Sequence, residues 1–229
     1  ADGKSFLPTG AVAHLTLDET LDDLAEAKRK VVIKGKTKWA DGKFGKAFDC
    51  DGSNWVDAGQ LGDFDNKDTF SYGCWIKPKG NANGAPIAKM EDGNSYRGYD
   101  MLFSNGVLSV HIINTWPTNA IKVNTKATLK KDEWQHVFVT YDGSNKAAGV
   151  KIYFDGKPQE WTIEQDRLSA TIRTKSPLHL GRRNPGGGFN GLIDEVRLFD
   201  RALSESEVLA LAGADPIAPL LAIKSDERS

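Results

Sequence analysis

The sequence predicts an all-β protein, an antiparallel β-sandwich with one short C-terminal helix. Short apolar runs with β-type patterning follow one another from about residue 11 to residue 199. Asn-Gly at 105–106 and Asp-Gly at 142–143 and 155–156 separate several of these runs, and such dipeptides close hairpins because they tolerate positive φ. The chain also holds 23 glycines in 229 residues, about 10% against about 7% in an average protein. That excess suits a fold with many tight turns.

The expected strands follow from the apolar runs in chain order. Each run is short and is bounded by turn signals. Because no helical crossover separates consecutive runs, neighbouring strands are expected to be antiparallel. The expected strands are Ala11–Leu17, Val31–Ile33, Phe44–Cys50, Phe70–Lys77, Tyr99–Phe103, Val107–Ile113, Ile121–Asn124, Trp134–Tyr141, Gly149–Phe154, Leu178–Leu180 and Gly191–Phe199.

One helix is expected after the last strand. Ser204 and Glu207 have the spacing of a capping box, apolar residues follow at 208, 209 and 211, and Gly213 marks the end. The segment Leu21–Lys30 is a weaker candidate that fits either a short polar helix or a loop. We therefore expect one domain over residues 10–213, with residues 214–229 as a linker or tail.

Composition excludes several classes of protein. The chain has 30 basic and 31 acidic residues, a formal net charge of -1, which argues against a nucleic-acid binder. No stretch reaches the roughly 18–20 apolar residues of a membrane span. Cys50 and Cys74 are too few for a zinc site. They fit either a single disulfide or two buried thiols, and the sequence leaves both open.

The sequence also argues against an enzyme. Its four histidines are scattered, and the HExxH, GxSxG, phosphate-loop and dinucleotide motifs are absent. A glycoside hydrolase needs two carboxylates that flank the scissile bond. Asp194 and Glu195 are adjacent on one expected strand, so they are expected to point to opposite faces. Glycoside hydrolysis is therefore disfavoured.

Asp194 is an unusual acidic residue. In strict alternation it shares a strand face with Leu192 and Val196, which predicts that it is buried. A buried carboxylate needs backbone donors, a cation or a metal. Two interpretations stay open: Asp194 ties down a neighbouring turn, or it binds a structural Ca²⁺ together with Asp18 and Asp51.

Aromatic residues in or beside expected loops are candidates for a binding site. Such rings stack on sugar rings, and nearby arginine and asparagine side chains donate hydrogen bonds. Trp116-Pro117 fits equally well as a hydrophobic plug that closes a loop. The candidate ligand-binding residues are Trp116, Tyr99, Arg97, Arg182, Arg183, Asn184 and Trp161, with Tyr96 as a further loop aromatic.

Several segments resemble the laminin-G-like, concanavalin A-like lectin/glucanase superfamily. They include FSYGCWIKP at 70–78, WQHVFVTYDG at 134–143 and GLIDEVRLFDRALS at 191–204. In the family's order they span about residues 10–213. The resemblance implies a jelly-roll sandwich. It says less about activity, because the superfamily contains binders, adhesive modules and a few enzymes.

A narrower resemblance is to the laminin-G-like module of large secreted planctomycete proteins that also carry cytochrome-c-like domains. It rests on Gly98–Leu102, Trp116–Ile121, Lys146–Val150 and Leu180–Arg183. Residues 217–229 resemble the start of the linker that follows that module. The resemblance implies an extracytoplasmic module with a structural Ca²⁺. No haem is expected on this chain, which lacks CxxCH.

The function expected from these observations is non-catalytic binding of a carbohydrate by a secreted, periplasmic or cell-surface module. The alternative is a structural or protein-interaction domain of a larger protein, and glycoside hydrolysis ranks third. The expected partner is accordingly a glycan or a partner protein domain.

Overall fold

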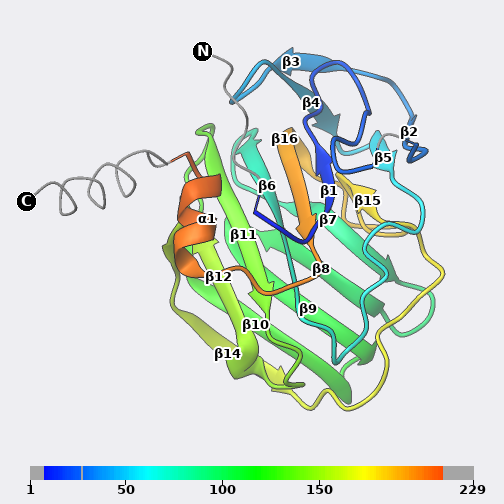
Figure 1. Ribbon diagram of the computed structural model, residues 1–229, viewed down its shortest axis with the longest axis vertical. Coiled ribbons are helices and arrows are strands. Elements are labelled where there is room, and N and C mark those ends of the chain that lie inside the picture. Colours follow the sequence, from blue (N-terminus) through cyan, green and yellow to red (C-terminus); the bar gives the residue numbers. More distant parts are fainter. Residues whose placement is uncertain (1–7, 27, 214–229) are drawn as a thin grey trace, which may run out of the picture.

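The computed structural model describes residues 8–26 and 28–213 (Figure 1). Two eight-stranded antiparallel sheets pack face to face as a jelly roll, which confirms the predicted fold class. Sheet A contains β13 (Lys157–Pro158), β12 (Val150–Phe154), β11 (Gln135–Tyr141), β6 (Phe70–Pro78), β16 (Asn190–Phe199), β4 (Lys46–Asp51) and β3 (Trp39–Asp41), with β1 (Ala11–Leu15) beside β16. Sheet B contains β14 (Trp161–Asp166), β10 (Asn119–Thr128), β9 (Val107–Thr115), β8 (Arg97–Ser104), β7 (Gly84–Glu91), β15 (His179–Leu180), β5 (Trp55–Asp57) and β2 (Val32–Lys34).

The core lies between the two sheets and follows the two-residue period of the strands. Tyr72, Cys74 and Ile76 of β6 enter it from sheet A, and Tyr99 and Met101 of β8 enter it from sheet B. The alternate residues of β8 therefore point to the outer face of sheet B. The Tyr72 hydroxyl donates a 2.9 Å hydrogen bond to the backbone carbonyl at position 100, which fixes β8 against the opposite sheet.

The two cysteines are free thiols, both fully buried in the core. Burial raises the pKa of both thiols well above the ordinary value. The sequence had left a disulfide open, and the structure assigns Cys50 and Cys74 to packing.

A β-bulge in β16 overturns the strict alternation expected around Asp194. The pairing of β16 with β6 shifts register between Asp194 and Arg197, and Glu195 adopts a positive φ of 52°. As a result Val196 enters the core while Asp194 pairs with Trp75 on the outer side of sheet A. Asp194 is fully buried as predicted, but not because it shares a face with Val196.

The C-terminal helix α1 (Glu205–Leu211) forms with the predicted capping box. The Glu207 amide donates to the Ser204 hydroxyl, and the Ser204 amide donates to the Glu207 carboxylate. Val208 and Leu211 pack against apolar residues of β11 and β12, beside which α1 lies in Figure 1. No helix of the described residues is both long and apolar enough to span a membrane.

Two further expectations concern the segment 21–30 and the C-terminal tail. The segment 21–30 forms no helix in its described part: Asp23 instead makes an isolated bridge to Leu15. The Asp23 carboxylate accepts hydrogen bonds from the backbone amides of His14 and Ala25, so these two amides are paired without a helix. The expected tail, residues 214–229, lies outside the described residues.

Candidate functional site

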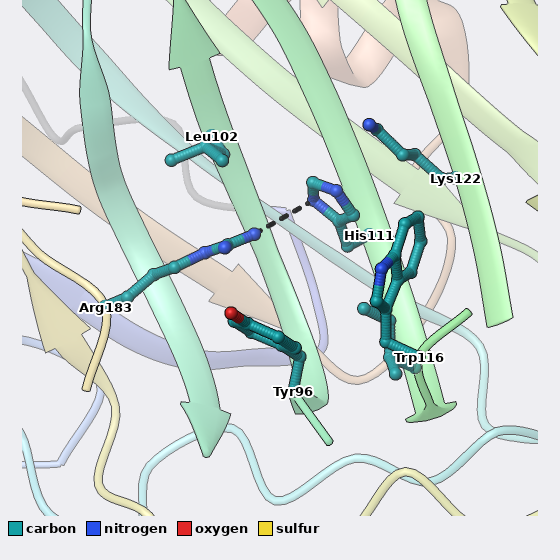
Figure 2. A pocket seen from close by; sticks show the side chains of 7 residues that line it. Tyr96, Leu102, His111, Trp116, Lys122 and Arg183 are labelled. Carbon is teal, nitrogen blue, oxygen red and sulfur yellow. Dashed lines mark hydrogen bonds between the residues drawn. The ribbon is translucent and has the colours of Figure 1, made fainter. Parts of the chain in front are cut away.

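Outward-facing side chains of β8, β9 and β10 line a hollow on the outer face of sheet B (Figure 2). Leu102 alternates with core residues of β8, and His111 alternates with core residues of β9, so both point away from the core. The hollow has a volume of about 250 Å³. Its lining residues are Tyr96, Leu102, His111, Ile113, Trp116, Lys122 and Arg183.

A buried carboxylate, Asp100, holds the base of this hollow together. Its Oδ1 lies 2.8 Å from Nδ1 of His111, and its Oδ2 accepts a 2.5 Å hydrogen bond from Nε of Arg183. Asp100 is fully buried, and burial alone would raise its pKa. The His111 ring and the Arg183 guanidinium outweigh burial and hold that pKa below its usual value. Asp100 is therefore ionised at neutral pH.

The ionised Asp100 sets the tautomer of His111. A carboxylate oxygen can only accept, so Nδ1 of His111 carries the proton in the 2.8 Å contact. Nη2 of Arg183 also lies 3.3 Å from Nδ1, but the shorter contact with the carboxylate decides the proton's position. In the neutral ring, Nε2 is then the acceptor. The pair thus presents an oriented imidazole to the hollow.

Two aromatic rings form walls of the hollow. Trp116, in the turn between β9 and β10, meets His111 edge-on at 5.8 Å between ring centroids. The Nζ of Lys122 lies 5.5 Å over the Trp116 ring, and the Arg183 guanidinium lies 5.6 Å over the Tyr96 ring. Trp116 is half-buried against a small cluster formed by Met90, Ile113 and Ala120. It therefore closes the loop as a plug and also offers a ring surface to the hollow.

Tyr99 is not a ligand-binding residue, so this prediction is wrong. Its side chain is 1% exposed and lies in the core beside Phe70 and Tyr72. Its hydroxyl donates a 2.9 Å hydrogen bond to the carbonyl of Gly62. Tyr99 belongs to β8 and not to a loop, and the two-residue period of that strand turns it inward.

Four other predicted residues lie outside the lining of the hollow in the described structure. Arg182 stacks on Trp55 with its guanidinium 4.2 Å from the ring centroid. Arg97 donates to the backbone carbonyl at position 114, and Asn184 donates to the hydroxyl of Ser176, on the other side of β15. Trp161 packs against the core from the edge strand β14. Only Trp116 and Arg183 of the predicted set meet at the hollow.

Sequence reasoning missed the other lining residues. A signal existed for His111 and Lys122, because each alternates with apolar residues of a predicted strand and must face outward. Tyr96 was noted only as a loop aromatic. No sequence signal pairs Asp100 and His111 with Arg183, which is 83 residues beyond Asp100.

The predicted calcium ligands are only partly brought together. Asp194 Oδ2 accepts hydrogen bonds from the amides of Lys43 (2.8 Å) and Phe44 (3.0 Å), and Asp18 Oδ1 accepts one from the amide of Lys46 (2.6 Å). Both carboxylates thus hold the turn between β3 and β4. Asp194 does tie down a neighbouring turn, the first of the two interpretations.

Asp51 does not belong to this group, which corrects the three-residue set. It lies at the opposite end of β4, where it pairs with Lys38 at 2.5 Å and bonds to Ser53. No cluster of three His, Cys, Asp or Glu side chains suited to a metal ion occurs in residues 8–26 and 28–213. A calcium ion beside Asp18 and Asp194 would therefore need backbone oxygens as well.

One observation does fit a cation beside Asp194. Its Oδ1 is buried and has no hydrogen-bond partner within the described chain. Burial, with the neighbouring charges of Glu195 and Asp18, raises the pKa of Asp194 to about 7. A cation would supply the missing partner and favour the ionised form. Calcium binding stays a prediction for the Asp18–Asp194 pair.

A jelly roll with a hollow of aromatic and polar side chains on one sheet has the architecture of a lectin-like binding domain. The chain belongs to the concanavalin A-like lectin/glucanase superfamily, whose family model matches residues 51–209. No curated protein sequence matches the chain.

Solved structures of the same fold are similar over most of this chain. The binding domain of Paraclostridial Mosquitocidal Protein 1 has a TM-score of 0.71 at 18% identity, covering 90% of this chain and 52% of that one. The binding domain of botulinum neurotoxin serotype C1 has a TM-score of 0.67 at 17% identity, with coverage of 90% and 52%. This chain thus spans about half of each toxin chain.

A third similar structure is domain 4 of AbnA, an extracellular GH43 arabinanase from Geobacillus stearothermophilus, in complex with arabinotriose. Its TM-score is 0.60 at 21% identity, and the match covers 88% of this chain and 98% of that one. At these identities the likenesses establish the fold alone.

Proposed function

We propose that this chain is a non-catalytic carbohydrate-binding module that takes a sugar ring in the hollow on sheet B. The observation that carries the proposal is the meeting of an aromatic wall, Trp116, with the oriented His111 and Arg183. Small-ligand sites combine apolar or aromatic surface with a few convergent polar groups. The hollow has this composition.

The proposed binding mode assigns a task to each group. The apolar face of a sugar ring packs on the Trp116 indole. Nε2 of His111 accepts a hydrogen bond from a sugar hydroxyl, because Asp100 fixes the proton on Nδ1. The free N–H groups of Arg183 and the hydroxyl of Tyr96 donate to ring or hydroxyl oxygens.

The arrangement favours binding over hydrolysis. Hydrolysis of a glycosidic bond requires a general acid and a second carboxylate about 5–9.5 Å apart. None of the residues that line the hollow is acidic, and Asp100 beneath them is fully buried and occupied by His111 and Arg183. Glu164 at the rim is paired with Lys122 and is the one exposed carboxylate described beside the lining. Binding without bond cleavage is the chemistry that this lining supports.

The comparisons support the same class of function. The arabinanase domain was solved with arabinotriose, and a neurotoxin of the same fold depends for cell entry on two ganglioside molecules. The arabinanase is extracellular, which supports the proposal that this module acts outside the cytoplasm. We propose in addition that the module is part of a large secreted multidomain protein of a planctomycete.

A second candidate is a protein-interaction domain. A botulinum neurotoxin binding domain of this fold, 15% identical with a TM-score of 0.66, was solved in complex with rat synaptotagmin II. In that case the module would position partner domains and would bind no glycan.

A glycan array followed by calorimetry tests the proposal. We expect binding of at least one glycan class, weakened at least tenfold by Trp116→Ala, or about 1.4 kcal/mol. The matched control is Phe44→Ala, which removes an exposed aromatic ring in the turn between β3 and β4, packed against Trp75 of sheet A, and should leave affinity unchanged. Circular dichroism confirms that both variants fold. A blank array favours the interaction domain, and equal effects of the two variants would place the site elsewhere.

A further inference from the structure

We propose that the hollow selects a sugar ring that bears a carboxylate, such as a uronic acid or a sialic acid. This inference rests on the proposed function and names its ligand class. The observation is the charge of the lining: Arg183 and Lys122 are cationic, and no acidic residue contributes to the lining. The acidic partners of these two cations, Asp100 for Arg183 and Glu164 for Lys122, lie outside the lining, so the groups that face the hollow are the cationic donors.

The Arg183 guanidinium retains donors for a ligand. Its Nε is bonded to Asp100, and its Nη2 lies near His111, yet arginine has five N–H donors in all. The Asp100 carboxylate holds the guanidinium in place from below, and being fully buried it is not itself presented to the hollow. Arginine in a fixed orientation is well suited to carboxylate recognition.

Lys122 already holds a carboxylate at the rim. Its Nζ lies 2.7 Å from Oε2 of Glu164 on the neighbouring strand β14, and the Glu164 side chain is 43% exposed. The Lys122 side chain is only 19% exposed, but the carboxylate end of the pair faces solvent, where an ion pair contributes only about 0–1 kcal/mol. A ligand carboxylate can therefore replace Glu164 as the partner of Lys122 at little cost in free energy. Lys122 then stays paired with a carboxylate, and the exposed Glu164 side chain turns to solvent. The pair with Glu164 shows the geometry in which Lys122 receives such a group.

The volume limits the ligand to a small unit. At about 250 Å³ the hollow lies below the roughly 300–1,000 Å³ of typical drug-sized sites. It suits one sugar ring, with the rest of a glycan outside. The carboxylate must then belong to the ring that packs on Trp116, between Lys122 and Arg183 (Figure 2).

Matched ligand pairs test the proposal by calorimetry. The probes are oligogalacturonate and sialyllactose, each compared with its own methyl ester, at low and at high ionic strength. We expect at least one acidic member to bind at least tenfold more tightly than its neutral partner, with the difference reduced by salt. Equal affinities, or binding only of neutral glycans on the array, overturn the acidic-ligand proposal and leave carbohydrate binding intact. If no glycan binds, the proposed function itself fails.

Two substitutions are expected to change the affinity for the acidic ligand in opposite directions. Lys122→Gln should weaken binding of the acidic ligand at least tenfold, whereas Glu164→Gln should strengthen it several-fold because it frees Lys122. The matched control is Lys126→Gln: Lys126 lies further along β10, is exposed and pairs with Glu160. Lys126→Gln should leave the affinity for the acidic ligand unchanged. Equal effects of Lys122→Gln and Lys126→Gln, or weaker binding with Glu164→Gln, would contradict the proposal.

Discussion

Asp100 shows how a single buried residue determines a surface site. The residue contacts no ligand in the proposed binding mode, yet it fixes the imidazole of His111 and the guanidinium of Arg183. Arg183 was predicted as a free donor near a loop. The structure adds that its position depends on the carboxylate of Asp100 in the middle of β8, a residue to which the sequence assigned no role.

The first prediction concerns the stability contributed by this buried ion pair. Asp100→Asn keeps the shape of the side chain but leaves the Arg183 charge without its counter-ion. Removal of one partner of a buried pair costs about 3–5 kcal/mol. We expect the unfolding free energy, measured in urea, to fall by about 3 kcal/mol.

The control for this change is an exposed ion pair. Asp41 pairs with Lys46 at 3.0 Å, and its side chain is 96% exposed. Asp41→Asn should alter the unfolding free energy by no more than about 0.5–1 kcal/mol. If the two variants were equally stable, the Asp100 pair would not support the site.

At the scale of elements, the structure adds strands that the sequence pattern did not indicate. The longest is β7 (Gly84–Glu91), whose sequence GAPIAKME contains glycine, proline and lysine and has low β-propensity. It forms because β8 and β15 pair with its two edges. The short strand β5 and the edge strand β14 likewise depend on partners distant in sequence, β15 and β10, whereas β3 and β13 form short hairpins with the neighbouring strands β4 and β12.

The turn between β3 and β4 gives the second prediction. The buried Asp194 Oδ1 lacks a partner in the described chain, and Asp18 holds the same turn. We expect millimolar Ca²⁺ to raise the melting temperature of the protein, and Asp194→Asn to abolish that rise. Asp51→Asn is the control and should retain it, because Asp51 lies at the other end of β4. An unchanged melting temperature of the unsubstituted protein would exclude calcium here.

At the scale of the whole molecule, stability should depend on pH through a buried histidine. His136 lies on the outer side of sheet A against the rings of Trp75 and Phe138. Burial, together with the positive charge of Arg197, lowers its pKa to about 3. In the unfolded chain the pKa is about 6.5.

The third prediction follows from this difference. Between about pH 6.5 and pH 3 the unfolded chain binds a proton that the folded protein does not. The contribution of His136 to stability is therefore lost as the pH falls, by up to about 1.4 kcal/mol per pH unit. His136→Phe keeps an aromatic ring and removes the proton site. Urea unfolding at several pH values should give this variant a shallower pH dependence, and parallel curves would contradict the assignment.

Much of the fold could be predicted because its signals are local. Alternation located β6, β9 and β11 to within a few residues, and Ser204 with Glu207 located α1. The candidate site was harder to predict from the sequence, because the pairing of strands distant in the chain decides which residues meet. Tyr99 was misplaced because the signal of a nearby loop outweighed the period of its strand.

The sequence by itself determined the sandwich, the helix and the likeness to the lectin/glucanase superfamily, since turn chemistry and the two-residue period act over a few residues. The tertiary structure alone decided the site. Arg183 reaches Asp100 and His111 across 83 and 72 residues of chain. A bulge in β16 turned Asp194 outward beneath a turn 150 residues away. Such contacts depend on the order in which strands pair, which no local pattern encodes.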